Sequence, residues 1–156
     1  MKKNIFIASD HGAVELCQEI LLFVIKQYSN LYDVIHLGCE SKGSVDYPDY
    51  ADKLVTRVLE TPGNLGVLCC GTGIGMSIRA NRYPQIRAAL VHDRFTAKMA
   101  KVHNNANVIC MGGRVLDISI AAPMISDWID SEFESGRHER RLDKLDNPTL
   151  SSHTHG

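Results

Sequence analysis

The sequence predicts a three-layer α/β fold around a five-stranded parallel sheet. Three observations support this class. The length of 156 residues fits one domain. Short apolar runs read as strands, and a stretch with helical spacing follows each of them. Strands that alternate with helices imply right-handed crossovers and a sheet covered on both faces, a Rossmann-like arrangement. The expected strands are residues 4–9, 33–38, 65–70, 87–92 and 107–111.

The helices follow from spacing and from start signals. Apolar residues from Leu16 to Val24 recur at helical intervals after the first strand. Asp46 followed by Tyr47-Pro48 is typical of an N-cap with a first-turn proline. The last of five expected helices runs from about residue 117 to 134. We expect one domain, residues 1–146, and a frayed tail, residues 147–156, rich in Ser, Thr and His.

Composition excludes several classes of protein. The 17 Lys and Arg balance 18 Asp and Glu, so the chain lacks the positive field that nucleic-acid binding needs. The longest uncharged span, residues 61–78, contains five glycines and a proline, which argues against a membrane helix. An odd number of cysteines without a Cys-x-x-Cys pair indicates the reducing cytoplasm. They are Cys17, Cys39, Cys69, Cys70 and Cys110.

The turn after the third strand is rich in glycine, and ligands of such sheets bind beyond the carboxyl ends of the strands. Backbone amides of Gly71-Thr72-Gly73-Ile74-Gly75 can surround an anion at a helix N-terminus. The dinucleotide fingerprint fails at Met76, and no Gly-Lys pair follows for a P-loop. An oxyanion site or a small phosphate site remains, beside the alternative of a structural turn.

Cys70 lies where this strand ends and the helix amides begin, which favours the thiolate and suggests a base or nucleophile. The alternative is a small buried apolar side chain. Cys69 must face the other way if the strand is regular. The spacing alone does not choose between the two.

Two histidines and two arginines are further candidates. Asp10-His11 ends the first strand, and His103-Asn104 ends the fourth helix. Two histidines entering one cleft would be acid–base candidates, although single histidines are more often surface or core residues. Arg137 and Arg141 share a helical face and could bind a phosphate, unless the face is merely solvated. His153 and His155 lack a carboxylate or cysteine nearby, so we expect no metal site.

Together these motifs resemble the type B ribose-5-phosphate isomerases, a group related to galactose-6-phosphate and allose-6-phosphate isomerases. The resemblance spans the chain to about Leu142. It rests on the segments 8–12, 46–51, 70–81, 103–108, 113–115 and 136–141, which occur in the order typical of that family.

The resemblance implies that Cys70 is the base and that Thr72 and His103 assist ring opening. Some relatives use a glutamate base where this chain has Met76, so the chain is similar to the cysteine branch. The implied substrate contacts are Asp10, His11, the amides of Gly71, Gly73, Ile74 and Gly75, and the side chains of Asn104, Arg114, Arg137 and Arg141.

The implied activity is interconversion of ribose 5-phosphate and ribulose 5-phosphate through an enediolate, in the non-oxidative pentose phosphate pathway. It requires a base, donors for the enediolate oxygen and a fixed phosphate, but no metal or cofactor. The resemblance implies a homodimer in which His103 and the arginines, Arg114 included, come from the neighbouring subunit, and a tetramer stays open. The alternatives are a six-carbon sugar-phosphate isomerase or a phosphate- or mononucleotide-binding module without catalysis.

Overall fold

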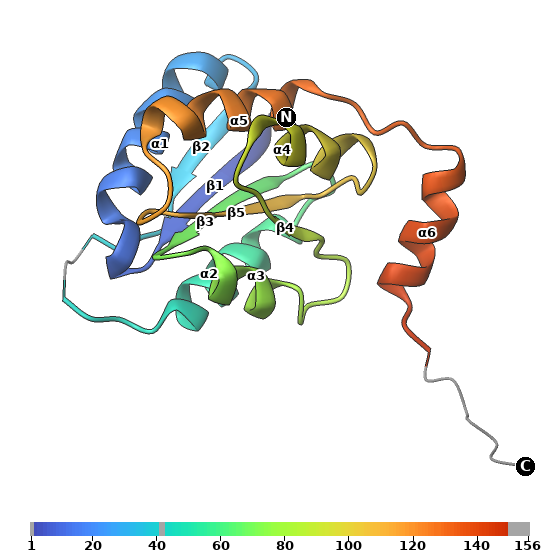
Figure 1. Cartoon of the computed structure of the whole chain (residues 1–156), viewed down its shortest axis with the longest axis horizontal. Coiled ribbons are helices and arrows are strands. Elements are labelled where there is room, and N and C mark those ends of the chain that lie inside the picture. The colour runs from blue at the N-terminus through green and yellow to red at the C-terminus, as the bar shows by residue number, and fades with distance from the viewer. Residues whose placement is uncertain (1, 41–42, 150–156) are drawn as a thin grey trace, which may run out of the picture.

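The computed structural model describes residues 2–40 and 43–149. Five parallel strands form one sheet in the order β2-β1-β3-β5-β4 (Figure 1). The predicted sheet is therefore confirmed, with small shifts at the strand ends. The strands are β1 (Lys3–Ser9), β2 (Tyr32–His36), β3 (Leu65–Cys70), β4 (Ala88–Leu90) and β5 (Val108–Gly112).

Helices cover both faces of the sheet, which confirms the three layers (Figure 1). One face packs against α1 (Val14–Tyr28), α4 (Arg94–Val102) and α5 (Ile118–Asp130). The other packs against α2 (Tyr47–Val58) and α3 (Ile74–Ala80). Trp128 and Phe6, one in each core cluster, are fully buried, and each such side chain contributes about 1.5 to 3 kcal/mol. None of the helices in the described ranges has the length and apolar character needed to cross a membrane.

The end of α5 corrects the predicted helix 117–134. The helix stops at Asp130, and Ser131 is extended with its hydroxyl donating to the Asp127 carbonyl at 2.6 Å. The Glu134 amide then donates to the Val102 carbonyl at 3.0 Å, which fixes the connecting segment against the end of α4. A further helix, α6 (Arg137–Asp146), follows. The described residues thus contain six α-helices where five were expected, because this hydrogen bond to α4 favours an extended path over continued helix.

Aspartates start several helices at the carboxyl edge of the sheet. Asp93 forms a capping box with Thr96, and the Asp117 carboxylate accepts from the Ile120 amide. Asp10 does the same for the 3-10 helix η1 (His11–Ala13), which leads into α1. Asp46 occupies the N-cap position of α2 as predicted, but its side chain makes no capping hydrogen bond, and Pro48 lies in the first turn.

The order of the strands creates a crevice between β1 and β3. These strands are neighbours, yet the helices that follow them, α1 and α3, pack on opposite faces of the sheet. A parallel sheet opens beyond its carboxyl ends at such a point, and ligands bind there. The turns after β1 and β3 therefore flank the natural binding crevice.

The predicted tail, residues 147–156, falls outside the described residues from 150 onward. The last helix ends at Asp146. The boundary between the domain and the tail stays a prediction.

Candidate active site

Three turns meet at the carboxyl end of β3. A Cβ on Gly12 would lie 3.1 Å from the Gly71 nitrogen, a tight contact, so a side chain there would push the first and third turns slightly apart. The Gly113 amide donates to the Cys70 carbonyl at 2.8 Å, which adds the turn after β5. The crevice therefore contains the ends of β1, β3 and β5.

Cys70 lies at the centre of these turns. Its side chain is 5% exposed, faces the α2 and α3 layer, and accepts a hydrogen bond at Sγ from the Gly73 amide at 3.1 Å. This amide directs the positive end of its dipole at the sulfur, as a site for a thiolate requires. Cys69 faces the opposite layer and is fully buried, which confirms that the two thiols point apart.

Three of the other four thiols are poorly suited to act as a base. Burial raises the pKa of Cys69 well above that of a free thiol, and it raises the pKa of Cys110 as well. Burial also raises the pKa of Cys17 to about 11. These thiols stay protonated at neutral pH, so Cys70 is the better candidate for a base than Cys69, the choice that spacing left open.

Asp10 and His11 form the first turn, which is joined to β3 because the Asp10 amide donates to the Cys69 carbonyl at 3.1 Å. The Asp10 carboxylate accepts from the Gly12 amide at 2.8 Å and is 7% exposed. His11 Nδ1 accepts from the Val45 amide at 3.1 Å, so Nε2 is the ring nitrogen that can carry a proton to donate. A ring nitrogen that carries a proton and is free of this contact is suited to donate to a sugar oxygen.

The glycine turn is already engaged in part. The Gly73 amide donates to Cys70, and the Ile74 amide donates to the Thr72 hydroxyl at 3.3 Å. The resemblance implied that both amides bind substrate. An oxyanion must therefore compete with these two internal acceptors for them.

Arg114 requires a correction, because the resemblance assigned it to the neighbouring subunit. A Cβ on Gly71 would lie 3.0 Å from Arg114 Nη1 of the same chain. The Arg114 amide also donates to the Gly71 carbonyl at 3.0 Å, and this short turn after β5 fixes the residue there. Each chain therefore supplies a guanidinium to its own Cys70 crevice.

Tyr47 is a wall of the crevice that the sequence reasoning missed. Its ring carbon Cζ lies 2.6 Å from the point that a Cβ on Gly75 would occupy. The segment 46–51, in which Tyr47 lies, was part of the family resemblance, so the signal was present. Its position over the glycine turn depends on how α2 packs, which the sequence does not show.

The remaining candidates lie at the other end of the sheet. Helix α4 returns antiparallel to the strands, and His103 caps its C-terminus, accompanied by Asn104. Asn107, a few residues on, accepts from the amide of Gly66 at the start of β3. Cys70 lies four residues after Gly66 on β3, or about 13 Å along the strand.

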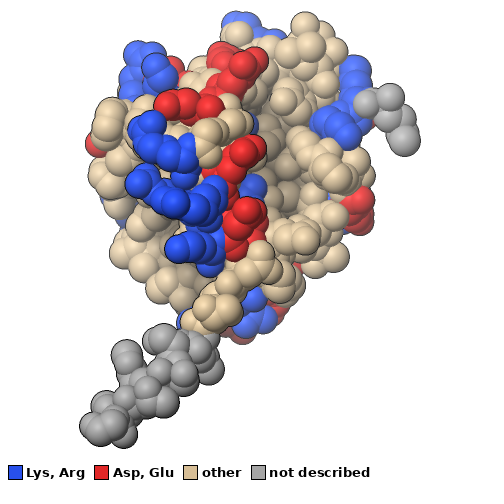
Figure 2. Space-filling model, turned by 90° about the vertical axis from the view of Figure 1, so that its right-hand side faces the viewer, with Lys and Arg blue, Asp and Glu red and all other residues tan. Residues whose placement is uncertain are grey.

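Arg137 and Arg141 lie on α6, which stands beside the body of the molecule (Figure 1). His138 of α6 stacks on His103 with ring centroids 4.5 Å apart, so both arginines belong to the His103 end. Figure 2, a view onto this side, shows Lys and Arg side chains gathered beside a row of Asp and Glu. One chain therefore does not bring His103, Arg137 and Arg141 to its own Cys70.

The chain has clear relatives among known proteins. The family described as Ribose/Galactose Isomerase matches residues 5–145. A protein of Rickettsia typhi, provisionally named a sugar phosphate isomerase, is 44% identical over 91% of this chain and 96% of its own length. The ribose-5-phosphate isomerase B of Escherichia coli is 32% identical over 92% and 94%. A ribose 5-phosphate isomerase structure from Thermotoga maritima superposes with a TM-score of 0.87 at 42% identity, covering 94% of this chain and 99% of that one.

Gly73→Ala is expected to lower the free energy of unfolding by more than the matched change Gly136→Ala. Both glycines have positive φ, +81° and +59°, where a side chain costs about 1 to 3 kcal/mol. An alanine Cβ at Gly73 would also lie 2.9 Å from the Met111 carbonyl carbon, whereas nothing lies within 4 Å at Gly136. Chemical denaturation of both variants measures the difference. Equal losses would show that the turn can move away from β5.

Proposed function

Because the chain belongs to the ribose/galactose isomerase family and is an isomerase, we propose that it interconverts ribose 5-phosphate and ribulose 5-phosphate through an enediolate. The observation that carries the proposal is the position of Cys70, which lies at the topological crevice with a backbone amide on its sulfur. A solved structure from Thermotoga maritima and a sequence from Escherichia coli are both named as ribose-5-phosphate isomerases, which supports the choice of substrate.

The proposed chemistry transfers one proton between two carbons. Cys70 Sγ, as the thiolate, removes the proton from C2 and returns it to C1, the former carbonyl carbon, after the enediolate forms. The proton of the C2 hydroxyl moves to the oxygen on C1 during the same interconversion, so the aldehyde becomes a ketone. The turn after β3 supplies N–H groups to the enediolate oxygen, in competition with the Thr72 hydroxyl. His11, with its proton on Nε2, binds a sugar hydroxyl, and Arg114 contributes charge at the rim.

A second copy of the chain is proposed to complete the site. His103, which would donate a proton to the ring oxygen, and the phosphate-binding Arg137 and Arg141 lie at the other end of the sheet from Cys70. Exposed apolar side chains border the Cys70 turn, as at many interfaces between copies. They are Ile74 at 50%, Ile78 at 54%, Leu90 at 40% and Phe95 at 71% exposure. We therefore propose a homodimer with two shared sites.

The pathway that we propose follows from the two substrates, and the compartment follows from the cysteines. Interconversion of these two pentose phosphates is a step of the non-oxidative pentose phosphate pathway. All five cysteines lie within the described residues; they are buried and none of them is in a disulfide bond. Reduced thiols support a reducing compartment, the cytoplasm.

Deuterium exchange tests the proposed function. The purified protein is incubated with ribose 5-phosphate in D2O, and NMR follows ketose formation and deuterium at C2. Turnover with exchange is the expected result. Faster exchange and turnover with allose 6-phosphate or galactose 6-phosphate would replace the proposed substrate by a six-carbon one. Saturable binding without exchange would contradict the proposal and indicate a binding module.

Mixed dimers test the shared site. Cys70→Ala and His103→Ala homodimers should each be inactive, because one lacks the base and the other the acid. After subunit exchange, the mixed dimer has one site with both groups intact, so roughly a quarter of the activity should return, as random mixing makes half of the dimers mixed and restores one site of two. Activity assays and native mass spectrometry of the mixture measure both quantities. Complete exchange without recovery would contradict a shared site.

A further inference from the structure

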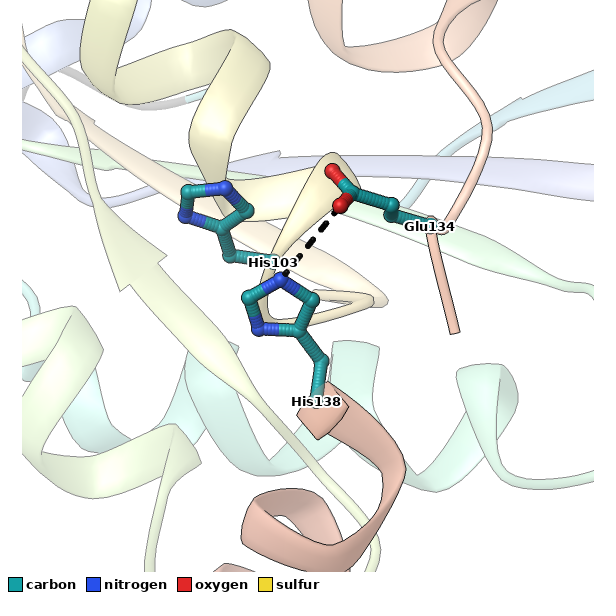
Figure 3. Close-up of side chains that lie close together, drawn as sticks. All are labelled: His103, Glu134 and His138. Carbon is teal, nitrogen blue, oxygen red and sulfur yellow. Dashed lines mark ion pairs between the residues drawn. The ribbon is translucent and has the colours of Figure 1, made fainter. Parts of the chain in front are cut away.

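His103, Glu134 and His138 converge from three segments of the chain. His103 ends α4, Glu134 lies on the connection before α6, and His138 is in the first turn of α6 (Figure 3). One ligand atom from each of the three side chains lies within 4.8 Å of the other two. The hydrogen bond from the Glu134 amide to the Val102 carbonyl fixes the backbone beside His103. The cluster is therefore built by tertiary structure.

His138 supplies the observation that points to a ligand. It is 4% exposed, and its Nε2 has no hydrogen-bond partner although it is buried. The nearest carboxylate oxygen, Glu134 Oε1, is 4.0 Å away, too far for a hydrogen bond (Figure 3). A buried, unpaired ring nitrogen normally costs free energy, and a bound ion would remove that cost.

We propose that His103, Glu134 and His138 form a binding site for Zn²⁺, with water as the fourth ligand. Two imidazoles and one carboxylate are a donor set that zinc prefers, whereas calcium and magnesium prefer oxygen alone. In a tetrahedral site neighbouring ligand atoms are about 3.3 Å apart. The ligand atoms must therefore approach by up to about 1.5 Å. This requires the exposed Glu134 side chain to rotate and the His103 ring to turn out of its stack on His138.

Nearby charges both favour and oppose this site. The exposed carboxylate of Glu134 favours a cation, whereas Arg137 and Arg141 lie on the same helix as His138. The same arginines repel a divalent cation. Arg137 lies 3.7 Å from Glu134 in an exposed ion pair, which the metal would have to displace. The site is thus expected to bind zinc reversibly rather than as a permanent structural ion.

A consequence follows that rests on the proposed function. If His103 donates the proton that opens the sugar ring, zinc on its ring removes that proton donor. Zinc should then inhibit turnover, and a chelator should restore it. The site would thereby make the isomerase sensitive to free zinc.

Direct titration tests the site without reference to activity. The metal-free full chain is titrated with Zn²⁺ by calorimetry and with Co²⁺ by visible absorption. We expect one ion per chain, with cobalt bands typical of nitrogen and oxygen ligands. Glu134→Ala and His138→Ala should each weaken binding at least tenfold. Because Glu134 is exposed, its variant stays folded even if the buried His138 change perturbs α6.

Two controls separate this site from others. Glu132→Ala, an exposed acid on the same connection, should leave the affinity unchanged. The double variant His153→Ala/His155→Ala should also bind normally. The site would be overturned if the natural chain did not bind zinc, or if Glu134→Ala bound it with equal affinity. Loss of binding in the tail variant, or a thiolate-to-cobalt charge-transfer band, would also overturn it. Zinc binding without any isomerase activity would support the site and count against the proposed function alone.

Discussion

Cys70→Ser should lower the turnover number by about a hundredfold to ten-thousandfold in a protein that stays folded. The serine hydroxyl has nearly the size of the thiol and can accept the same Gly73 amide, which lies 3.1 Å from Sγ. It does not ionise near neutral pH, so positioned proton transfer is lost while the shape of the crevice is retained. Steady-state kinetics and loss of deuterium exchange at C2 measure the effect.

Cys69→Ser is the matched control, because the two cysteines are neighbours on β3 and their side chains lie on opposite faces of the sheet. Cys69 is fully buried in the layer of α1 and α5, so its hydroxyl is expected to cost about 1 to 3 kcal/mol of stability. Its turnover should change little. Loss of turnover in folded Cys69→Ser together with normal turnover in Cys70→Ser would reverse the assignment of the base.

Alkylation gives a second readout of the same assignment. Iodoacetamide reacts with thiolates, and burial raises the pKa of Cys69 and Cys110 far above neutrality. Near neutral pH the reagent should therefore label Cys70 first, and ribose 5-phosphate should protect it. Peptide mapping identifies the labelled residue, and labelling that substrate does not slow would place the reactive thiol outside the substrate site.

The core of the site could be predicted because parallel α/β sheets have regular rules. Alternation of strands and helices implied the layers, and the carboxyl ends of the strands then implied where Asp10, Cys70 and Gly73 would meet. Opposite facing of Cys69 and Cys70 followed from the two-residue repeat of a strand. Only the choice between the two thiols needed tertiary information, namely which layer contains the glycine turn.

Other features depend on packing that local sequence does not encode. The break between α5 and α6 follows from the hydrogen bond that the Glu134 amide donates to the Val102 carbonyl. These two residues belong to distant parts of the chain, so the spacing of apolar residues within α5 or α6 does not predict their contact. The contact between Arg114 and Gly71 follows from the order of β3 and β5 in the sheet. The stacking of His103 on His138 depends on where α6 lies, so the cluster that they form with Glu134 could not be predicted from the sequence.

Arg141→Ala should raise the Michaelis constant for ribose 5-phosphate roughly tenfold to over a hundredfold, since a charge-assisted hydrogen bond contributes about 1.5 to 3 kcal/mol. The geometry of α6 supports a role for Arg141. Arg141 follows His138 by three residues on α6, so the two side chains are neighbours on the helix surface and the guanidinium lies near the His103 and His138 pair. Because one turn of helix separates them, Arg137 and Arg141 share a face that can bind one phosphate.

Arg140→Ala is the matched control for Arg141→Ala, with the same side chain on the same helix. His138 and Leu142 are the buried residues of α6, and each residue turns the helix by about 100°. Arg141 then lies beside the buried face, whereas Arg140 points away from it into solvent. Steady-state kinetics should show a raised Michaelis constant for Arg141→Ala and a normal one for Arg140→Ala, with thermal unfolding unchanged in both. Equal increases in both variants would mean that α6 acts through its total charge and that no phosphate is bound by one of its faces.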